Sequence, residues 1–161
     1  RTGLPLTHVD SHQHMHMLPG VIDISLDVAA SLNLDAVRIS RTPLFTAFAG
    51  MGQLIGRLGL FTLSELSLWK AKRRHFRVPD HFEGIVAGEA VHEGHFLHIL
   101  KDLRPGTTEV MMHPGTDNEK LIPACDWAHD FEAEMQAIVS PKVRRMIADK
   151  AVKVVNYRDL K

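Results

Sequence analysis

Cysteine is nearly absent from the sequence, and neither sign of charge is in excess. The single cysteine, Cys125, allows no internal disulfide and no cysteine-based zinc site among 161 residues, so we predict a reducing, cytoplasmic location. The 19 basic residues balance the 19 acidic ones, which removes a global attraction to nucleic acid, and we predict no nucleic-acid partner. No apolar run reaches the roughly 18 residues that span a bilayer, so no transmembrane segment is expected, and residues 1–6 lack the apolar core of a signal peptide.

Hydrophobic residues make up 45% of the sequence and fall into alternating strand-like and helix-like segments. The pattern predicts strands at residues 6–12, 36–40, 107–115 and 151–157, the third running into a loop. It predicts helices at residues 21–33, 44–75, 88–103, 126–140 and 140–150, with Asp126 and Ser140 as N-caps, and a loop at 78–84. The apolar positions of the first helix are Val21, Ile24, Val28 and Leu32, and those of the second are Leu54, Leu58, Phe61, Leu66 and Trp69. Those of the third are Val91, Phe96, Ile99, Leu100 and Leu103.

This order of elements predicts the fold class. Strands that alternate with helices favour a parallel sheet covered by helices, so we assign the chain to the α/β class. No repeat, low-complexity segment or linker interrupts the pattern, and 161 residues suffice for one hydrophobic core. Residues 1–161 are therefore expected to form a single domain.

Polar residues gather where the predicted parallel strands end, and active sites of α/β proteins lie at that edge. The first strand ends in DSHQHMH with His12 and His14, the second in RISR with Arg38 and Arg41, and the third in MHPG with His113. Three strands that deliver metal-binding or anion-binding groups to one edge predict a functional site there.

The stretch THVDSHQHMHMLPG, residues 7–20, places four histidines and Asp10 on alternate positions. In an extended strand His12 and His14 would lie about 6.6 Å apart on one face and could share an ion, whereas about 26 Å would separate His8 from His16. At most two of the four histidines can therefore bind one ion directly. The others bind substrate, orient the ligands or pack against neighbours, and the sequence leaves these alternatives open.

Four motifs, in this order, resemble those of the YdjC-like carbohydrate deacetylase family: THVDSHQHMHMLPG, VRISR, PDHFEGI and TEVMMHPG. The family includes the chitooligosaccharide deacetylases and the hopanoid-biosynthesis-associated HpnK proteins, and the last two motifs are most similar to the HpnK branch. The resemblance extends from Leu4 to Leu160. It implies a deformed, TIM-barrel-like (β/α) barrel and a hydrolase of carbohydrate metabolism that removes an acetyl group from an N-acetylated sugar.

The resemblance also implies a divalent metal ion, magnesium or zinc, held by one aspartate and two histidines. The family's histidine after the DS pair matches His12, whereas the NADDFG-like strand and the GxH motif that supply the other ligands have no match here. We therefore expect the chain to be the C-terminal portion of a YdjC-like domain. It would lack the N-terminal strands, two of the three metal ligands and the aspartate base.

The remaining candidates receive roles from the reaction that the resemblance implies. His113 is predicted to be the catalytic acid that protonates the leaving amine. Glu109 lies four residues earlier, on the same face of the predicted strand, and could orient His113 or act only as a buried strut. Asp10 is predicted to support the metal ligands without binding the ion itself.

Substrate contacts are predicted for Arg38, His14 and His16, with Arg38 facing either the sugar or the oxyanion. The expected substrate is an N-acetylated sugar or glycolipid. An alternative is a non-catalytic binding or oligomerisation module of the same fold, in which a homo-oligomer covers core that the missing strands leave exposed.

Overall fold

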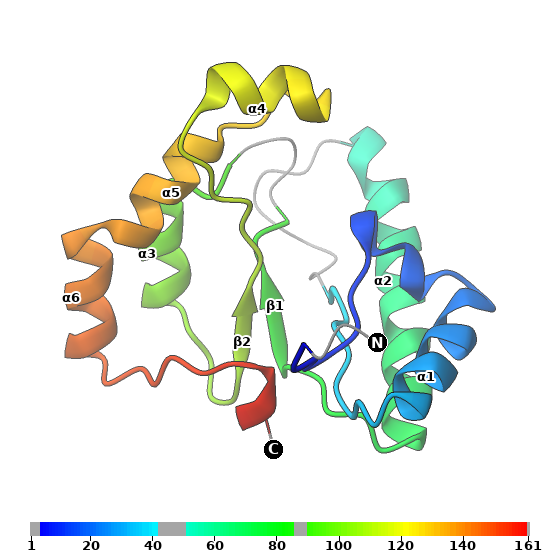
Figure 1. Ribbon diagram of the computed structural model, residues 1–161. Coiled ribbons are helices and arrows are strands. Elements are labelled where there is room, and N and C mark those ends of the chain that lie inside the picture. The colour runs from blue at the N-terminus through cyan, green and yellow to red at the C-terminus, as the bar shows by residue number, and fades with distance from the viewer. Residues whose placement is uncertain (1–3, 42–50, 86–89, 161) are drawn as a thin grey trace. The chain divides into compact units, whose positions relative to one another are not determined.

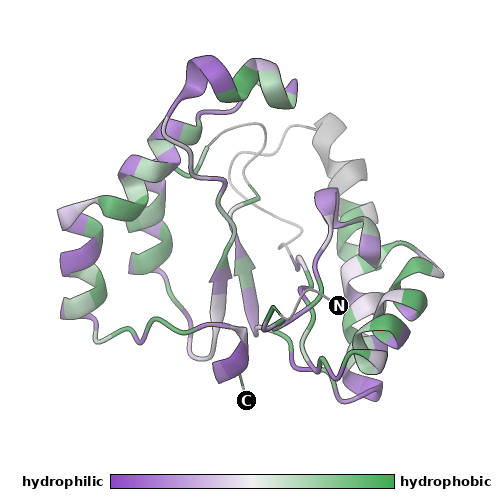
Figure 2. Ribbon diagram, in the orientation of Figure 1, coloured by the Kyte–Doolittle hydropathy of each residue, from purple (hydrophilic) through white to green (hydrophobic). Residues whose placement is uncertain are grey.

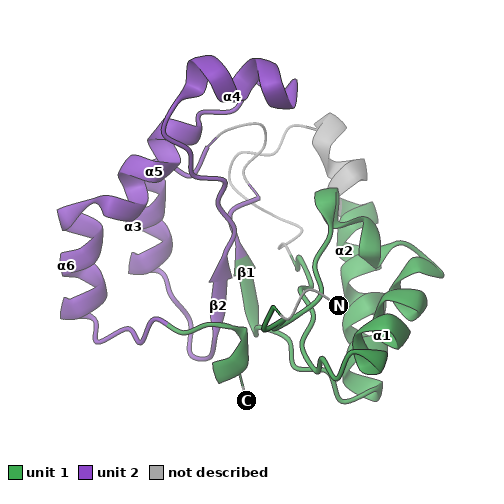
Figure 3. Cartoon of the chain, viewed as in Figure 1, with its two compact units in different colours: residues 1–82, 155–161 green, residues 83–154 purple. Residues whose placement is uncertain are grey.

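A computed structural model describes residues 4–41, 51–85 and 90–160, and only the backbone of residues 51–57. The chain divides into two compact units (Figures 1 and 3). Unit 1 comprises residues 1–82 and 155–161, and unit 2 comprises residues 83–154. Among the described helices, none is both long enough and apolar enough to cross a bilayer.

Unit 1 opens with an extended segment that turns into a 3-10 helix, η1 (His12–Met17), at the histidine-rich motif. Gln13 and His14 have left-handed backbone conformations with φ of 50° and 58°, which are incompatible with a strand. The strand pairing described in this segment is one parallel bridge from Val9 to Val37. The histidines of the motif therefore do not share one strand face, and the strand geometry predicted for them is wrong.

Helix α1 (Val21–Ser31) confirms the first predicted helix, but a different face of it is buried. Its fully buried side chains are Ile22, Leu26 and Ala29. The residues expected to form the apolar face are 40–64% exposed, and we call them the outer stripe of α1: Val21, Ile24, Val28 and Leu32. Hydrophobic residues recur along the length of the helix (Figure 2), and their exposure places them on two faces. Helical periodicity alone does not decide which face meets the core.

Helix α2 (Met51–Arg73) contacts α1, and ion pairs from Lys70 to Asp23 and from Arg74, directly after α2, to Asp27 join the two segments. Ser64, Ser67 and Ala71 have no exposed surface, and Ala71 belongs to the same core cluster as the buried residues of α1. Three of the large residues predicted to mark the apolar face are 39–54% exposed: Leu58, Leu66 and Trp69. A fourth, Leu54, lies outside the described side chains. Phe61 is half-buried.

Extended segments of unit 1 pair in parallel, as the α/β prediction requires. Parallel bridges join Val9 to Val37 and Ala36 to Arg77. Backbone hydrogen bonds follow the same order, with the Val9 N–H donating to the Ala36 carbonyl at 3.1 Å and the Val37 N–H to the Arg77 carbonyl at 3.1 Å. The strand predicted at 36–40 is thus present as two bridged residues.

The C-terminal segment returns to unit 1 and ends in a short 3-10 helix, η2 (Tyr157–Asp159). The Arg77 guanidinium donates to the carbonyls of Arg158 and Leu160 at 3.0 and 2.6 Å, and the Tyr157 ring stacks on His8. The strand predicted at 151–157 is wrong, because these described residues pair with no neighbouring strand. Asn156 instead caps η2 through a capping box.

Two short strands, β1 (His81–Glu83) and β2 (Thr108–Val110), form a two-stranded sheet. β2 confirms the third predicted strand, whereas β1 lies where a loop was expected. Gly84 follows β1 with φ of 102°, and a Cβ atom there would lie 2.2 Å from the Met111 carbonyl oxygen. Only glycine fits this close approach of two backbones.

The helices described in unit 2 are α3 (Glu93–Lys101), α4 (Asn118–Cys125), α5 (Phe131–Val139) and α6 (Pro141–Asp149). α3 buries Ile99 and Leu100, and Val91 just before it is also buried, as predicted. α3, α5 and α6 pack on one another in this unit. The start of α6 is confirmed, because Ser140 is its N-cap and Pro141 its first residue.

The predicted start of α5 is wrong. Asp126 is not an N-cap but the C-cap of α4, in the left-handed region with φ of 48°. Asp130 caps α5, where its carboxylate accepts the Ala133 N–H at 2.9 Å. Residues 126–130 therefore form a connection in which His129 lies before the helix.

The described elements together form a mixed α/β fold with a small sheet, parallel bridges and several helices. This confirms the α/β class. The barrel that the resemblance implies requires more paired strands than the described residues contain, and it stays a prediction.

Candidate functional site

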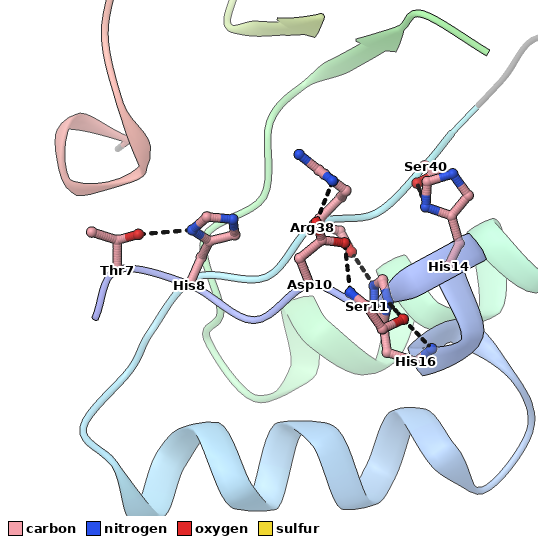
Figure 4. A network of polar contacts seen from close by, with 8 residues as sticks. All are labelled: Thr7, His8, Asp10, Ser11, His14, His16, Arg38 and Ser40. Atoms are coloured by element: carbon pink, nitrogen blue, oxygen red, sulfur yellow. Dashed lines mark hydrogen bonds and ion pairs between the residues drawn. The ribbon is translucent and has the colours of Figure 1, made fainter. Parts of the chain in front are cut away.

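Most of the predicted site residues of unit 1 lie in one polar network around η1 (Figure 4). Asp10 forms an ion pair with Arg38, and its other oxygen accepts the Ser11 N–H at 2.6 Å. The Arg38 side chain is 19% exposed and that of Asp10 is 31% exposed. The predicted sugar-binding arginine and the predicted supporting aspartate are thus brought into direct contact with each other.

His16 is buried, and both of its ring nitrogens are hydrogen-bonded within unit 1. Nε2 lies 2.7 Å from the Arg38 carbonyl oxygen, and because a carbonyl only accepts, Nε2 carries the proton. In the neutral ring Nδ1 then accepts from the Ser11 hydroxyl at 2.7 Å, and that hydroxyl oxygen accepts the His16 N–H at 2.9 Å. A substrate contact by His16 would require these bonds to break.

His12 and His14 occupy different surroundings. His12 is the exposed first residue of η1. His14 is half-buried, its Nδ1 lies 2.7 Å from the Ser40 hydroxyl, and its ring meets the Phe82 ring edge-on at 5.8 Å. The two rings therefore do not form the side-by-side pair that an extended strand would give.

A second cluster lies in unit 2, around His113. The Glu134 carboxylate is buried, and its two oxygens accept backbone N–H groups, Oε1 from Val91 at 2.9 Å and Oε2 from His113. The Nε2 atom of buried His129 lies 3.2 Å from Oε1 of Glu134 without the alignment of a hydrogen bond, so this buried nitrogen has no hydrogen-bond partner. One ligand atom from each of His113, His129 and Glu134 lies within 4.8 Å of the others, so these three residues could hold a metal ion.

Aromatic rings surround this cluster. Trp127 stacks on His129 with ring centroids 4.1 Å apart and planes inclined by 23°. His113 meets Trp127 and His129 edge-on, at 4.9 and 5.5 Å, and Phe131 lies edge-on to both Trp127 and His129. His129 is buried under this stack, while Trp127 keeps 43% of its surface exposed.

Asp130 joins this cluster to the start of α5. The side-chain amide of Asn118 donates to Asp130 at 2.8 Å and lowers the pKa of the Asp130 carboxyl below its usual value, and the Ala133 N–H adds to this effect. The carboxylate thus stays ionised while it caps the helix that carries Glu134.

The residue predicted to orient His113 is not the one that contacts its backbone. Glu109 lies in β2, which ends at Val110, so the argument that placed Glu109 and His113 on one strand face does not extend to His113. Glu134 instead accepts the His113 N–H. A role for Glu109 stays a prediction.

His129 and Glu134 were missed by the sequence-based reasoning for a geometric reason. Five residues of a continuous helix turn by about 500°, so in the helix predicted from residue 126 the two side chains would diverge by about 140°. Because α5 begins at Phe131, His129 belongs to the preceding connection and can fold back toward Glu134. The Asp130 cap was the available signal.

The sequence has recognisable relatives. A profile of the YdjC-like protein family matches residues 1–149. Three relatives are named carbohydrate deacetylase. The protein from Thermoanaerobacter pseudethanolicus is 28% identical over 99% of this chain and 54% of its own length. The Brevibacillus brevis protein is 23% identical over 98% of this chain and 55% of its own length, and the Mus musculus protein is 26% identical over 96% of this chain and 55% of its own length. The chain thus spans about half the length of these curated relatives, and no solved structure matches it.

Proposed function

The chain belongs to the YdjC-like family, and on that premise we propose that it is part of a metal-dependent hydrolase that removes an acetyl group from an N-acetylated sugar or glycolipid. The observation that carries the proposal is the family match over residues 1–149, together with relatives named carbohydrate deacetylase. Because the chain spans about half the length of those relatives, we place the remaining metal ligands and the catalytic base outside these 161 residues. A cytoplasmic location and a place in the hopanoid-linked branch belong to the same proposal.

His12 is the proposed ligand of the divalent ion, magnesium or zinc. Its imidazole is exposed at the start of η1 and is of a type that transition metals accept. The three-residue cluster found among the described residues does not include His12, so we propose that His12 binds this ion together with ligands from elsewhere in the protein. A bound divalent ion supplies positive charge that polarises an amide carbonyl.

His113 is the proposed acid of the reaction. The amide C–N bond breaks as the oxygen of water bonds to the acetyl carbon, and the nitrogen leaves as a free amine only after it receives a proton. The protonated form of the His113 imidazole would supply that proton. The proposal is supported by Glu134, which holds the backbone N–H of His113 and so fixes the segment that carries the imidazole.

The residues around η1 are proposed to contact the substrate. Arg38 would bind a sugar hydroxyl or the oxyanion, with Asp10 holding its guanidinium in place. His14 is a candidate sugar contact next to Ser40. His16 would have to release Ser11 or the Arg38 carbonyl to take part, so it is the weakest of these candidates.

Acetate release from an N-acetylglucosamine oligosaccharide tests the proposal. It is measured for this chain and for any longer product of the same reading frame. His113→Asn is expected to lower kcat about 10²–10⁴-fold with little change in KM, because general acid catalysis contributes that much to the chemical step. His12→Ala is expected to abolish release.

His98→Asn is the matched control, because His98 is an exposed histidine on α3 in the same unit, and it should keep wild-type kcat. Wild-type kcat in His113→Asn would remove His113 from the mechanism. Failure of the longest product to release acetate from any N-acetylated sugar would remove the proposed activity itself.

The outer stripe of α1 favours a second candidate, a homo-oligomeric binding module. Four apolar side chains spaced along one helix face are 40–64% exposed, and such faces commonly mark association surfaces. Two copies joined through this stripe would bury it. Light scattering of the purified chain decides the point, since a monomer at high concentration contradicts this candidate.

A further inference from the structure

The cluster of His113, His129 and Glu134 has the donor set of a transition-metal site. Two imidazoles and one carboxylate are a combination that zinc accepts, whereas magnesium prefers oxygen ligands alone. The three ligand atoms lie within 4.8 Å of one another, and two of the residues are buried. Donors around a tetrahedral zinc ion lie about 3.4 Å apart for bond lengths of about 2.0–2.2 Å, so side-chain rotation alone can close the cluster.

The cluster also has unused binding capacity. The buried Nε2 of His129 has no hydrogen bond, although an uncompensated buried polar atom is costly. Each Glu134 oxygen accepts one backbone N–H, and a carboxylate oxygen has a second lone pair for a further partner. A metal ion would engage the orphan nitrogen and the second lone pair while the two backbone bonds stay in place.

We propose that His113, His129 and Glu134 form a binding site for a transition-metal ion such as Zn²⁺, and that the bound ion occupies the His113 imidazole. Metal binding goes beyond the function proposed above. The predicted inhibition of acetate release rests on that function, because an imidazole that ligates a metal cannot also donate a proton to a leaving amine. Zn²⁺ at this site would therefore inhibit acetate release.

Trp127 provides a direct readout of binding, because its indole stacks on His129. The chain has two tryptophans, so Trp69→Phe leaves Trp127 as the only source of indole emission. In this background paramagnetic Co²⁺ should quench Trp127 emission. If binding is tight, the quenching should saturate at one Co²⁺ ion per chain. Diamagnetic Zn²⁺ should then compete and restore the emission.

Two variants in the same background test the ligands. His129→Gln and His113→Ala should each weaken the apparent Kd for Co²⁺ by about tenfold or more, because loss of an outer-shell partner alone costs about 10–100-fold. His113→Ala keeps the backbone N–H of residue 113 that Glu134 accepts. Far-ultraviolet circular dichroism confirms that each variant is folded.

Two exposed histidines serve as controls. His98→Ala removes an imidazole from α3, and His12→Ala removes the ligand that the proposed hydrolase uses. Both should leave the saturable quenching unchanged. Quenching that is absent in the parent, or that persists at the same Kd in both His129→Gln and His113→Ala, overturns the site.

The binding experiment needs no substrate, so its failure is separate from failure of the proposed hydrolase. If acetate release is found, Zn²⁺ in excess of the activating ion should inhibit it, and His129→Gln should reduce that inhibition at least tenfold in concentration. Equal inhibition in the parent and His129→Gln would overturn the proposed consequence.

Discussion

The two histidine clusters of the chain differ in what their ring nitrogens bind. In unit 1 the dense motif at residues 7–20 contains buried His16, whose two nitrogens meet a hydroxyl and a carbonyl. In the unit 2 cluster His113 meets His129, and the buried Nε2 of His129 has no hydrogen bond and lies beside a carboxylate. The density of histidines in the sequence thus does not measure how much unused binding capacity a cluster holds.

The difference also concerns how each cluster is supported. The unit 1 network consists mainly of hydrogen bonds around one short 3-10 helix, with the Asp10–Arg38 ion pair at its edge. The unit 2 cluster is organised by one buried carboxylate, Glu134, which reaches two backbone segments. Removal of a single group should therefore have a larger effect in unit 2.

The largest effect is expected for Glu134→Gln. Glutamine has one acceptor oxygen, so it can satisfy Val91 or His113 but leaves the other buried N–H facing an NH₂ donor. We expect the free energy of unfolding to fall by about 2–3 kcal/mol, measured by urea denaturation.

Glu132→Gln is the matched control on the same helix. Glu132 is exposed and accepts one N–H from Asn118 at 3.0 Å, so its substitution should change the free energy of unfolding by less than about 0.5 kcal/mol. Equal losses in the two variants would show that Glu134 does not organise the cluster.

The contrast between the two histidine clusters could not be predicted from the sequence. Local signals succeeded where one residue type decides the structure, as at Ser140 and Pro141, which begin α6. They failed at α1, where two apolar stripes compete and packing selects the buried one. They failed again at His129 and Glu134, because their approach depends on where α5 begins.

The histidine motif shows the same limit in the backbone. Alternating polar residues suggested a strand, but Gln13 and His14 take left-handed conformations that close η1. Tertiary contacts of Met17 and His16, both buried, favour this turn over an extended chain. The sequence pattern therefore did not predict the backbone geometry of this motif.

A smaller effect is expected for His16→Phe, which keeps a ring of similar size in the buried site. The variant leaves the Arg38 carbonyl and the Ser11 hydroxyl without their ring partners, so the free energy of unfolding should fall by about 1–3 kcal/mol. His12→Phe, at an exposed position in the same motif, should change it by less than about 0.5 kcal/mol. Thermal or urea unfolding measures both variants. Equal losses of unfolding free energy in His16→Phe and His12→Phe would contradict the comparison.

The smallest effect concerns the charge of Asp130, which holds α5 next to the unit 2 cluster. Hydrogen bonds from Asn118 and the Ala133 N–H lower the pKa of this carboxyl in the folded protein, so its contribution to stability is complete above the unfolded pKa of about 3.9. That contribution is lost as the pH falls through the lower, folded pKa.

Asp130→Asn keeps an N-cap acceptor but removes the titration. The difference in unfolding free energy between wild type and Asp130→Asn should therefore be constant from pH 5 to 7 and decrease as the pH falls below about 4. Asp130→Ala should lose about 1 kcal/mol at neutral pH, because the cap itself is gone. Urea unfolding as a function of pH measures wild type and both variants. If the difference in unfolding free energy between wild type and Asp130→Asn grew toward low pH, the ionised Asp130 carboxylate would not stabilise the folded protein.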